Sequence, residues 1–217
     1  MNNSQHPTKP KSTNSIVSSK NRVSGWLQSL EGELGKPVSA KVVVQIVYLL
    51  LDCSGSMAES LNDAKQGALD FSRQAISDGY QVGLISFSSA AALVTPPLQN
   101  IEDLRARMAQ LGVSGSTNMA DAIHLGIKEL TEIRGRRALV VVTDGVPDDK
   151  SAALDAAKRA VAAGIDIITV GTDGADAAFL GLLTSRSGLV VSVPRAGLAT
   201  GIASASKLLL GTTPKGK

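Results

Sequence analysis

The sequence predicts a doubly wound α/β domain, in which a mainly parallel sheet carries helices on both faces and one short antiparallel strand at its edge. Three observations support this prediction. Uniformly apolar runs of strand length recur along the chain, as expected for strands buried on both faces of a parallel sheet. Segments with apolar residues at helical spacing separate these runs. The alternation of the two patterns indicates repeated βαβ units.

The strands are expected where apolar runs stop at turn residues or at single polar residues. The first run, KVVVQIVYLLLD, ends at Asp52, and RALVVVTD ends at Asp144. The run AALVTPPLQ contains Pro96 and Pro97, which confine it to a sheet edge because proline cannot donate a hydrogen bond to a neighbouring strand. The predicted strands cover 41–52, 80–87, 91–99, 137–144, 165–173 and 188–193.

The helices are expected between the strands. The first helical segment places a row of apolar residues on one face, which should pack on the sheet. This row consists of Leu61, Ala64, Ala68, Phe71 and Ala75. Gly164 ends a later helix, as glycine commonly does. The predicted helices cover 62–76, 101–111, 118–130, 151–164, 175–185 and 196–210.

The chain divides into an extension, a folded domain and a short tail. Residues 1–35 are polar and basic, and we expect them to be disordered apart from an amphipathic helix near 24–34. The apolar face of that helix holds Trp26, Leu27, Leu30 and Leu34. It could dock on the following domain or bind a partner. The folded domain is predicted at 41–211, followed by a flexible tail at 212–217.

The charge and the aromatic content argue against a nucleic-acid partner. The net charge is +3, but residues 1–41 hold six Lys and Arg against two Glu, so the surplus belongs mainly to the extension. Aromatic residues make up only 3% of the chain, which leaves few surfaces on which bases could stack.

The cysteine content and the hydropathy suggest a cytoplasmic protein. Cys53 is the single cysteine, so no intramolecular disulfide can form, which fits a reducing compartment. The apolar runs are far shorter than the ~20 residues that span a bilayer, and the first residues lack a signal-peptide pattern. We therefore expect no membrane contact.

The two predicted strands that end at Asp52 and Asp144 should bring both carboxylates to the same rim of the sheet, the one formed by the carboxyl ends of its parallel strands. In open α/β sheets, ligands bind at the carboxyl ends of the strands. Asp52 opens the pattern D-x-S-x-S with Ser54 and Ser56, and the loop GVSGSTN adds the hydroxyl of Thr117. These oxygen groups suit a hard cation such as Mg²⁺, and the site could accept a further carboxylate from outside.

Three enzymatic interpretations fit this rim less well. The loop GVSGSTN lacks the spacing and the lysine of a phosphate-binding loop. The segment DCSGSM is not a nucleophile elbow, and His6 and His124 are poorly placed to activate a serine. An aspartyl phosphotransferase of the haloacid-dehalogenase kind would need a second carboxylate where Ser54 stands.

Taken together, DCSGSM, GSTN and VVTDG resemble the motifs of the von Willebrand factor A (vWA) domain family, over roughly residues 41–211. The resemblance implies a vWA/Rossmann-like fold and an intact metal-ion-dependent adhesion site (MIDAS). Its implied metal ligands are Asp52, Ser54, Ser56, Thr117 and Asp144. It also implies a non-enzymatic module that binds an acidic side chain of a protein partner through Mg²⁺, with Mn²⁺ or Ca²⁺ as alternatives.

Structural roles for the same residues stay open at this point. Ser56 and Glu59 match a helix capping box, and Asn118 could cap the helix after Thr117. Asp148 and Asp149 could open the helix after Asp144.

The leading functional hypothesis is a cytoplasmic adaptor whose partner could be an AAA⁺ ATPase or another complex subunit, as in compact members of the family. The alternatives are a metal-assisted phosphohydrolase, or a scaffold with an empty site that binds partners through its N-terminal segment.

Overall fold

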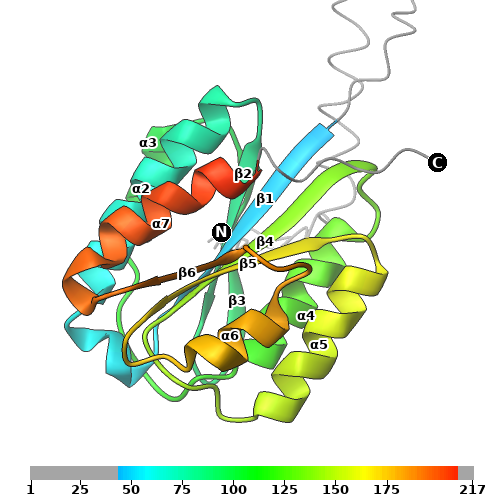
Figure 1. Cartoon of the computed structure of the whole chain (residues 1–217). Helices are drawn as coiled ribbons and strands as arrows, with labels where there is room; N and C mark the ends of the chain where they lie inside the picture. Colours follow the sequence, from blue (N-terminus) through cyan, green and yellow to red (C-terminus); the bar gives the residue numbers. More distant parts are fainter. Residues whose placement is uncertain (1–43, 210–217) are drawn as a thin grey trace, which may run out of the picture. The chain divides into compact units, whose positions relative to one another are not determined.

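The computed structural model describes residues 44–209, which form one α/β unit (Figure 1). The predicted extension at 1–35, its helix near 24–34 and the tail at 212–217 lie outside the described residues. Within the described part, the predicted fold class is confirmed: a mostly parallel sheet has helices on both faces and one antiparallel strand at its edge.

The described residues form a six-stranded sheet in the order β3-β2-β1-β4-β5-β6. All neighbouring strands run parallel except β2 and β3, which are antiparallel. The pairing of β2 with β3 contains register shifts, and β3 carries Pro96 and Pro97 at the sheet edge, as the sequence predicted. The strands are β1 Val44–Asp52, β2 Gln81–Phe87, β3 Ala91–Leu98, β4 Gly135–Thr143, β5 Asp166–Thr172 and β6 Val190–Val193.

Helices cover both faces of the sheet. Figure 1 shows α2, α3 and α7 on one face, with α4, α5 and α6 on the other. The helices are α2 Leu61–Ser77, α3 Ile101–Ala109, α4 Met119–Leu130, α5 Lys150–Ala162, α6 Ala177–Leu183 and α7 Leu198–Leu209. Two short 3₁₀ helices, η1 Gly55–Ala58 and η2 Arg195–Gly197, follow β1 and β6. Among the described residues, no helix is long and apolar enough to cross a membrane.

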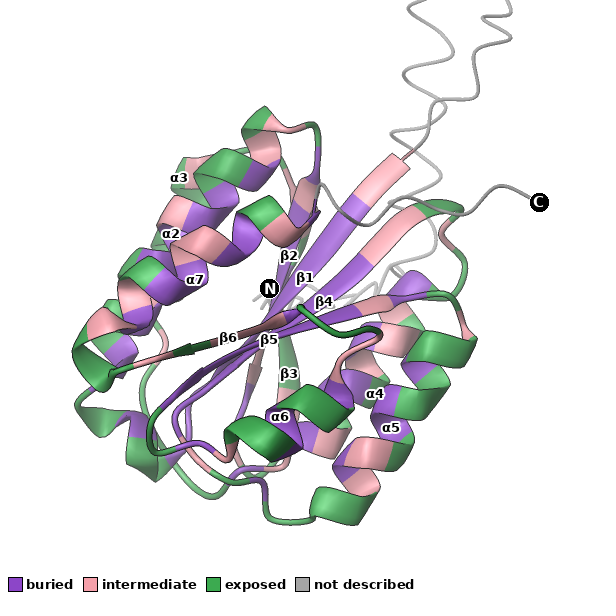
Figure 2. Cartoon of the chain, in the orientation of Figure 1, coloured by how far each residue is buried: buried purple, intermediate pink, exposed green. Residues whose placement is uncertain are grey.

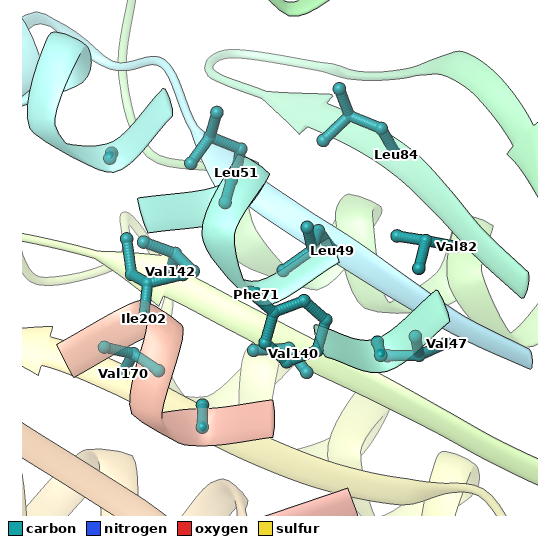
Figure 3. Close-up of a cluster of buried hydrophobic side chains, with 14 of the residues drawn as sticks. Val47, Leu49, Leu51, Phe71, Val82, Leu84, Val140, Val142, Val170 and Ile202 are labelled. Carbon is teal, nitrogen blue, oxygen red and sulfur yellow. The ribbon is translucent and has the colours of Figure 1, made fainter. Parts of the chain in front are cut away.

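The side chains of β1 alternate between two hydrophobic clusters, one on each face of the sheet. Val47, Leu49 and Leu51 pack with Phe71 of α2 and Ile202 of α7 (Figure 3). The intervening residues of β1 join the opposite cluster under α4, α5 and α6. Figure 2 shows the strands buried along most of their length, whereas the outer surfaces of the helices are exposed. Each fully buried Leu or Val contributes roughly 1.5–3 kcal/mol, so β1 is rigidly held.

The strand order places a topological switch point between β1 and β4. From β1 the chain proceeds through α2 to β2 on one side, and it later returns to place β4 on the other side. The register pairs Leu51 with Val142, so these two parallel strands end at the same level. The residues that follow them therefore meet at the carboxyl rim, where ligands bind in this class of sheet.

Candidate metal centre

Four of the five predicted ligands form a connected group at the switch point. Asp52 is the last residue of β1, Ser54 and Ser56 lie in the turn that follows, and Asp144 comes directly after β4. Hydrogen bonds link Ser54 to Asp52 and to Ser56, and link Ser56 to Asp144. Thr117 reaches the rim on a separate loop.

Both carboxylate oxygens of Asp52 accept hydrogen bonds. The backbone N–H of Ser54 donates to Oδ1 at 2.8 Å, and the hydroxyl of Thr143 donates to Oδ2 at 2.6 Å. Thr143 is the last residue of β4, so this second bond ties the ends of two neighbouring strands together. Asp52 is fully buried, and these bonds hold its carboxylate in a fixed orientation.

The two serine hydroxyls continue from Asp52 towards Asp144. The Oγ atoms of Ser54 and Ser56 lie 3.0 Å apart, and the hydroxyl of Ser56 donates to Oδ1 of Asp144 at 2.8 Å. Gly145 leaves room for this contact, since a Cβ atom there would lie 3.3 Å from Oγ of Ser56. The arrangement thus clusters the oxygens of two carboxylates and two hydroxyls.

Asp144 has an incompletely satisfied carboxylate. Its Oδ2 is buried and accepts no hydrogen bond from any described residue. The nearest cationic atom is Nη2 of Arg195, which lies 3.6 Å from Oδ2. Buried carboxylate oxygens are normally hydrogen-bonded, so this oxygen is a candidate for a bound cation.

The loop that carries Thr117 is fixed to the turn after β1 by its backbone. The N–H of Gly55 donates to the carbonyl of Gly115 at 3.1 Å, and the N–H of Ser114 donates to the carbonyl of Cys53 at 2.8 Å. Thr117 is buried, and its hydroxyl forms no hydrogen bond within residues 44–209. The loop thus brings Thr117 to the rim without bonding it to the other four side chains.

Two residues give this loop its shape. Gly115 has a φ angle of +69°, and a Cβ atom there would approach Oγ of Ser89 to 2.3 Å, so only glycine fits. The carboxylate of Asp148 accepts the N–H of Thr117 at 3.0 Å, while the N–H of Asp148 donates to the carbonyl of Thr117 at 3.0 Å. A hydrogen bond from the side chain of Ser116, together with the one from the N–H of Thr117, lowers the pKa of Asp148.

The electrostatics of the site favour an added positive charge. Burial raises the pKa of Asp52, and the nearby carboxylate of Asp144 raises it further, although hydrogen bonds from Thr143 and Ser54 act in the opposite direction. Two buried carboxylates that oppose each other's ionisation would both be stabilised by a cation between them. A hard cation with oxygen ligands suits the donor set of carboxylates and hydroxyls.

The structure tests the helix-capping roles that the sequence left open for several of these residues. Ser56 does not form a capping box with Glu59, because its hydroxyl faces Asp144, and Ser60 occupies the N-cap position of α2. Asn118 does cap α4, since its side chain accepts the N–H of Asp121.

The two adjacent acidic residues after β4 have different roles. Asp149 caps α5 by accepting the N–H of Ala152. Asp148 instead supports the Thr117 loop.

Sequence reasoning missed two residues of the site. Thr143 lies inside the quoted VVTDG segment, and its place before Asp144 was a usable signal, since it ends the neighbouring strand. Arg195 lies in η2, far along the chain, and carries no local signal of a role at this rim.

Comparison with known proteins assigns the family. The sequence profile of the von Willebrand factor type A domain matches residues 47–204, which contain all five predicted ligands. The chain belongs to the vWA domain family. Calcium-activated chloride channel regulator 4 of Homo sapiens is 29% identical to this vWA domain in an alignment of 128 residues that covers 55% of this chain and 14% of that protein. The chain therefore corresponds to a small part of that relative.

Solved structures share the fold of this vWA domain. The vWF domain of the type V pili tip protein Mfa5 from Porphyromonas gingivalis superposes with a TM-score of 0.69 at 11% identity, covering 81% of this chain and 98% of that one. Proximal thread matrix protein 1 from the mussel byssus, with a zinc-occupied MIDAS motif, superposes with a TM-score of 0.63 at 16% identity, covering 76% of this chain and 46% of that one.

Proposed function

We propose that this vWA domain is a metal-dependent protein-interaction module. Its cation ligands would be Asp52, Ser54, Ser56, Thr117 and Asp144, the set expected for a MIDAS. Mg²⁺ is the expected ion because hard oxygen donors suit it, with Mn²⁺ or Ca²⁺ as alternatives. The observation that carries the proposal is Oδ2 of Asp144, which is buried and accepts no hydrogen bond from the described residues.

Burial makes that oxygen costly in the absence of a cation. A buried carboxylate needs hydrogen bonds or a counter-charge, and within residues 44–209 the carboxylate of Asp144 accepts one hydrogen bond, from Ser56, on Oδ1. The fully buried Asp52 adds a second negative charge nearby. A zinc-occupied MIDAS in a mussel relative with the same fold supports a divalent ion for this site.

Each ligand residue has a defined part in the proposed binding. Asp52, held by Thr143 and the N–H of Ser54, would provide an oriented negative charge at the base of the site. The hydroxyls of Ser54 and Ser56 would turn from each other towards the ion. Thr117, whose hydroxyl is not otherwise engaged by described residues, would approach from the opposite loop.

A bound divalent cation would supply an additional coordination position that a carboxylate oxygen can take. The protein ligands would contribute only two negative charges, so the ion would retain affinity for a third carboxylate. We therefore propose a protein partner that presents an Asp or Glu side chain. The AAA⁺ ATPase partner, the cytoplasmic location and the domain bounds of 41–211 stay predictions.

Titration calorimetry with MgCl₂ and MnCl₂ tests the metal site. Wild-type protein should bind one ion, and Asp144→Asn should lose measurable binding because it removes the charge on the unsatisfied oxygen. Asp173→Asn is the matched control, since Asp173 is an exposed residue directly after β5 at the same rim. Equal binding by wild type and Asp144→Asn would refute the site assignment.

Capture experiments test the partner interaction. A partner should be retained by immobilised wild-type protein in Mg²⁺ and released by EDTA, and Asp144→Asn should retain none. In the identified partner, replacing the critical Asp or Glu by its amide should abolish binding. Retention that is indifferent to EDTA would argue against bridging by a metal.

The same variants separate this proposal from its alternatives. Turnover of p-nitrophenyl phosphate that disappears in Asp52→Asn would indicate a phosphohydrolase. Partner binding that survives Asp144→Asn but is lost when residues 1–35 are deleted would indicate the N-terminal scaffold.

A further inference from the structure

Arg195 reaches the metal centre from a distant part of the chain. It begins η2, the 3₁₀ helix between β6 and α7, and its guanidinium group extends to the end of β4. Nη2 lies 3.6 Å from Oδ2 of Asp144, and Nη1 lies 3.5 Å from Oε2 of Glu59. The guanidinium group thus bridges a buried carboxylate and an exposed one.

The contact with Asp144 is an ion pair without a hydrogen bond. Oδ2 of Asp144 accepts no hydrogen bond within residues 44–209, so Arg195 neutralises it through charge alone. The arginine side chain is 44% exposed, whereas that of Asp144 is fully buried. A half-exposed guanidinium can move away towards solvent or Glu59, but the carboxylate cannot follow it.

We infer that Arg195 competes with the divalent cation for Oδ2 of Asp144 and so sets the metal affinity of the site. This inference rests on the proposed function. Arginine stays protonated at all ordinary pH values, so its positive charge is always present. A cation that binds Asp144 would repel the guanidinium group a few ångströms away, and each would weaken the binding of the other.

The competition gives Arg195 two opposite effects. Without metal it supplies the counter-charge that the buried carboxylate of Asp144 otherwise lacks, which stabilises the folded protein. With metal present it opposes binding. An ordinary surface ion pair would show only the first effect, and that weakly.

Arg186 offers a matched control at the other end of the sheet. Its side chain is 43% exposed, and its Nη2 lies 4.0 Å from Oδ2 of Asp166, the first residue of β5. It therefore resembles Arg195 in exposure and in ion-pair geometry, but it lies away from the carboxyl rim.

The test measures Mg²⁺ affinity by calorimetry for wild type, Arg195→Gln, Arg195→Lys and Arg186→Gln. Arg195→Gln should bind Mg²⁺ about 3- to 30-fold more tightly, the range expected on removing one partly screened charge near the ion. Arg195→Lys keeps the charge and should stay close to wild type. Arg186→Gln should not change the affinity.

Thermal unfolding in EDTA and in Mg²⁺ gives a second readout. In EDTA, Arg195→Gln should melt below wild type because Asp144 has lost its counter-charge. Saturating Mg²⁺ should raise the melting temperature of Arg195→Gln by more than it raises that of wild type.

The outcomes separate the two proposals. Unchanged or weaker Mg²⁺ binding by Arg195→Gln, beside a wild type that binds, would overturn the role of Arg195 and leave the metal site standing. Binding by Arg195→Gln when wild type shows none would support the competition strongly. Absence of binding in both proteins would overturn both proposals.

Discussion

Asp52 ends β1 and Asp144 directly follows the neighbouring parallel strand β4, and both are buried, yet their surroundings differ. Asp52 accepts a hydrogen bond on each oxygen, from the N–H of Ser54 and the hydroxyl of Thr143. Asp144 accepts one on Oδ1 from Ser56, and its Oδ2 has only the ion pair with Arg195. The first carboxylate is satisfied by the fold, and the second is not.

This difference indicates that the two carboxylates have different roles at the carboxyl rim of the sheet. The bonds to Asp52 join β1, the turn after it and the end of β4, so its carboxylate helps to build the site. The carboxylate of Asp144 contacts an exposed serine, Ser56, and a half-exposed arginine, Arg195, so it can exchange partners. A binding site needs both kinds of group, because some side chains must hold the site in shape while others must be free to contact the ligand.

The largest difference between the two aspartates is expected in the free energy of unfolding of their alanine variants, measured in EDTA. Asp52→Ala should lower the free energy of unfolding by about 2 kcal/mol or more, because it leaves two buried donors unpaired. Asp144→Ala should cost less than about 1 kcal/mol, since it also removes an unsatisfied buried oxygen. Urea denaturation measures both values. Equal losses would show that the two aspartates are equivalent and would break the comparison.

Thr143→Val tests the hydrogen bonds around Asp52 alone. The substitution keeps the shape but removes the hydroxyl that donates to Asp52 and accepts the N–H of Gly145. We expect a loss of about 1–2 kcal/mol in the free energy of unfolding. Thr169→Val is the control, because that buried hydroxyl makes only a long bond of 3.4 Å, to a backbone carbonyl. A smaller loss for Thr143→Val than for Thr169→Val would contradict the assigned role.

Ser56→Ala tests the surroundings of Asp144. Ser56 is exposed, so the loss of its hydrogen bond to Asp144 should cost no more than about 1 kcal/mol of stability. Mg²⁺ affinity in calorimetry should fall about tenfold or more, as is typical when a group that binds or orients at a metal site is removed. Ser151→Ala, an exposed serine of α5, should change neither quantity. A large stability loss without an effect on Mg²⁺ would reverse the interpretation.

The last test concerns the thiol of Cys53, which lies between Asp52 and Ser54 in the sequence. Burial, aided by the charge of Asp52, raises the pKa of Cys53 to about 11. Native protein at pH 8 should therefore react with a disulfide reagent such as DTNB only as fast as it opens, whereas protein in guanidinium chloride should react at once. Rapid labelling of the native protein would show that the turn around Asp52 and Cys53 opens easily.

The raised pKa of Cys53 also predicts that stability depends on pH in the alkaline range. Because the folded pKa lies above the unfolded value of about 8.5, the stabilising contribution is complete below that value. It should decline as the pH rises towards 11. Cys53→Ala should remove this decline in urea denaturation series between pH 8 and pH 9.5, below the range in which the buried Tyr48, whose pKa is also raised by burial, adds a decline of its own.

Much of the fold could be predicted because hydrophobic periodicity and strand ends are local properties. The apolar row from Leu61 to Ala75 became the buried face of α2, and the prolines of β3 marked the antiparallel edge. The helix boundaries were less predictable. The segment predicted at 175–185 forms a helix only over Ala177–Leu183, because the side chain of Asp176 caps its start.

The sequence alone is enough to predict that Asp52 and Asp144 stand where two buried strands end, with two serines and a threonine available to join them. Parallel strands end at one rim, so the fold class predicts that these groups meet there. Which carboxylate oxygens accept hydrogen bonds depends on the three-dimensional fold. Thr143 reaches Asp52 because β1 and β4 are neighbours, and Arg195 reaches Asp144 because the turn after β6 folds back over the rim. Such contacts depend on strand order and on the paths of turns, which periodicity along the chain does not encode.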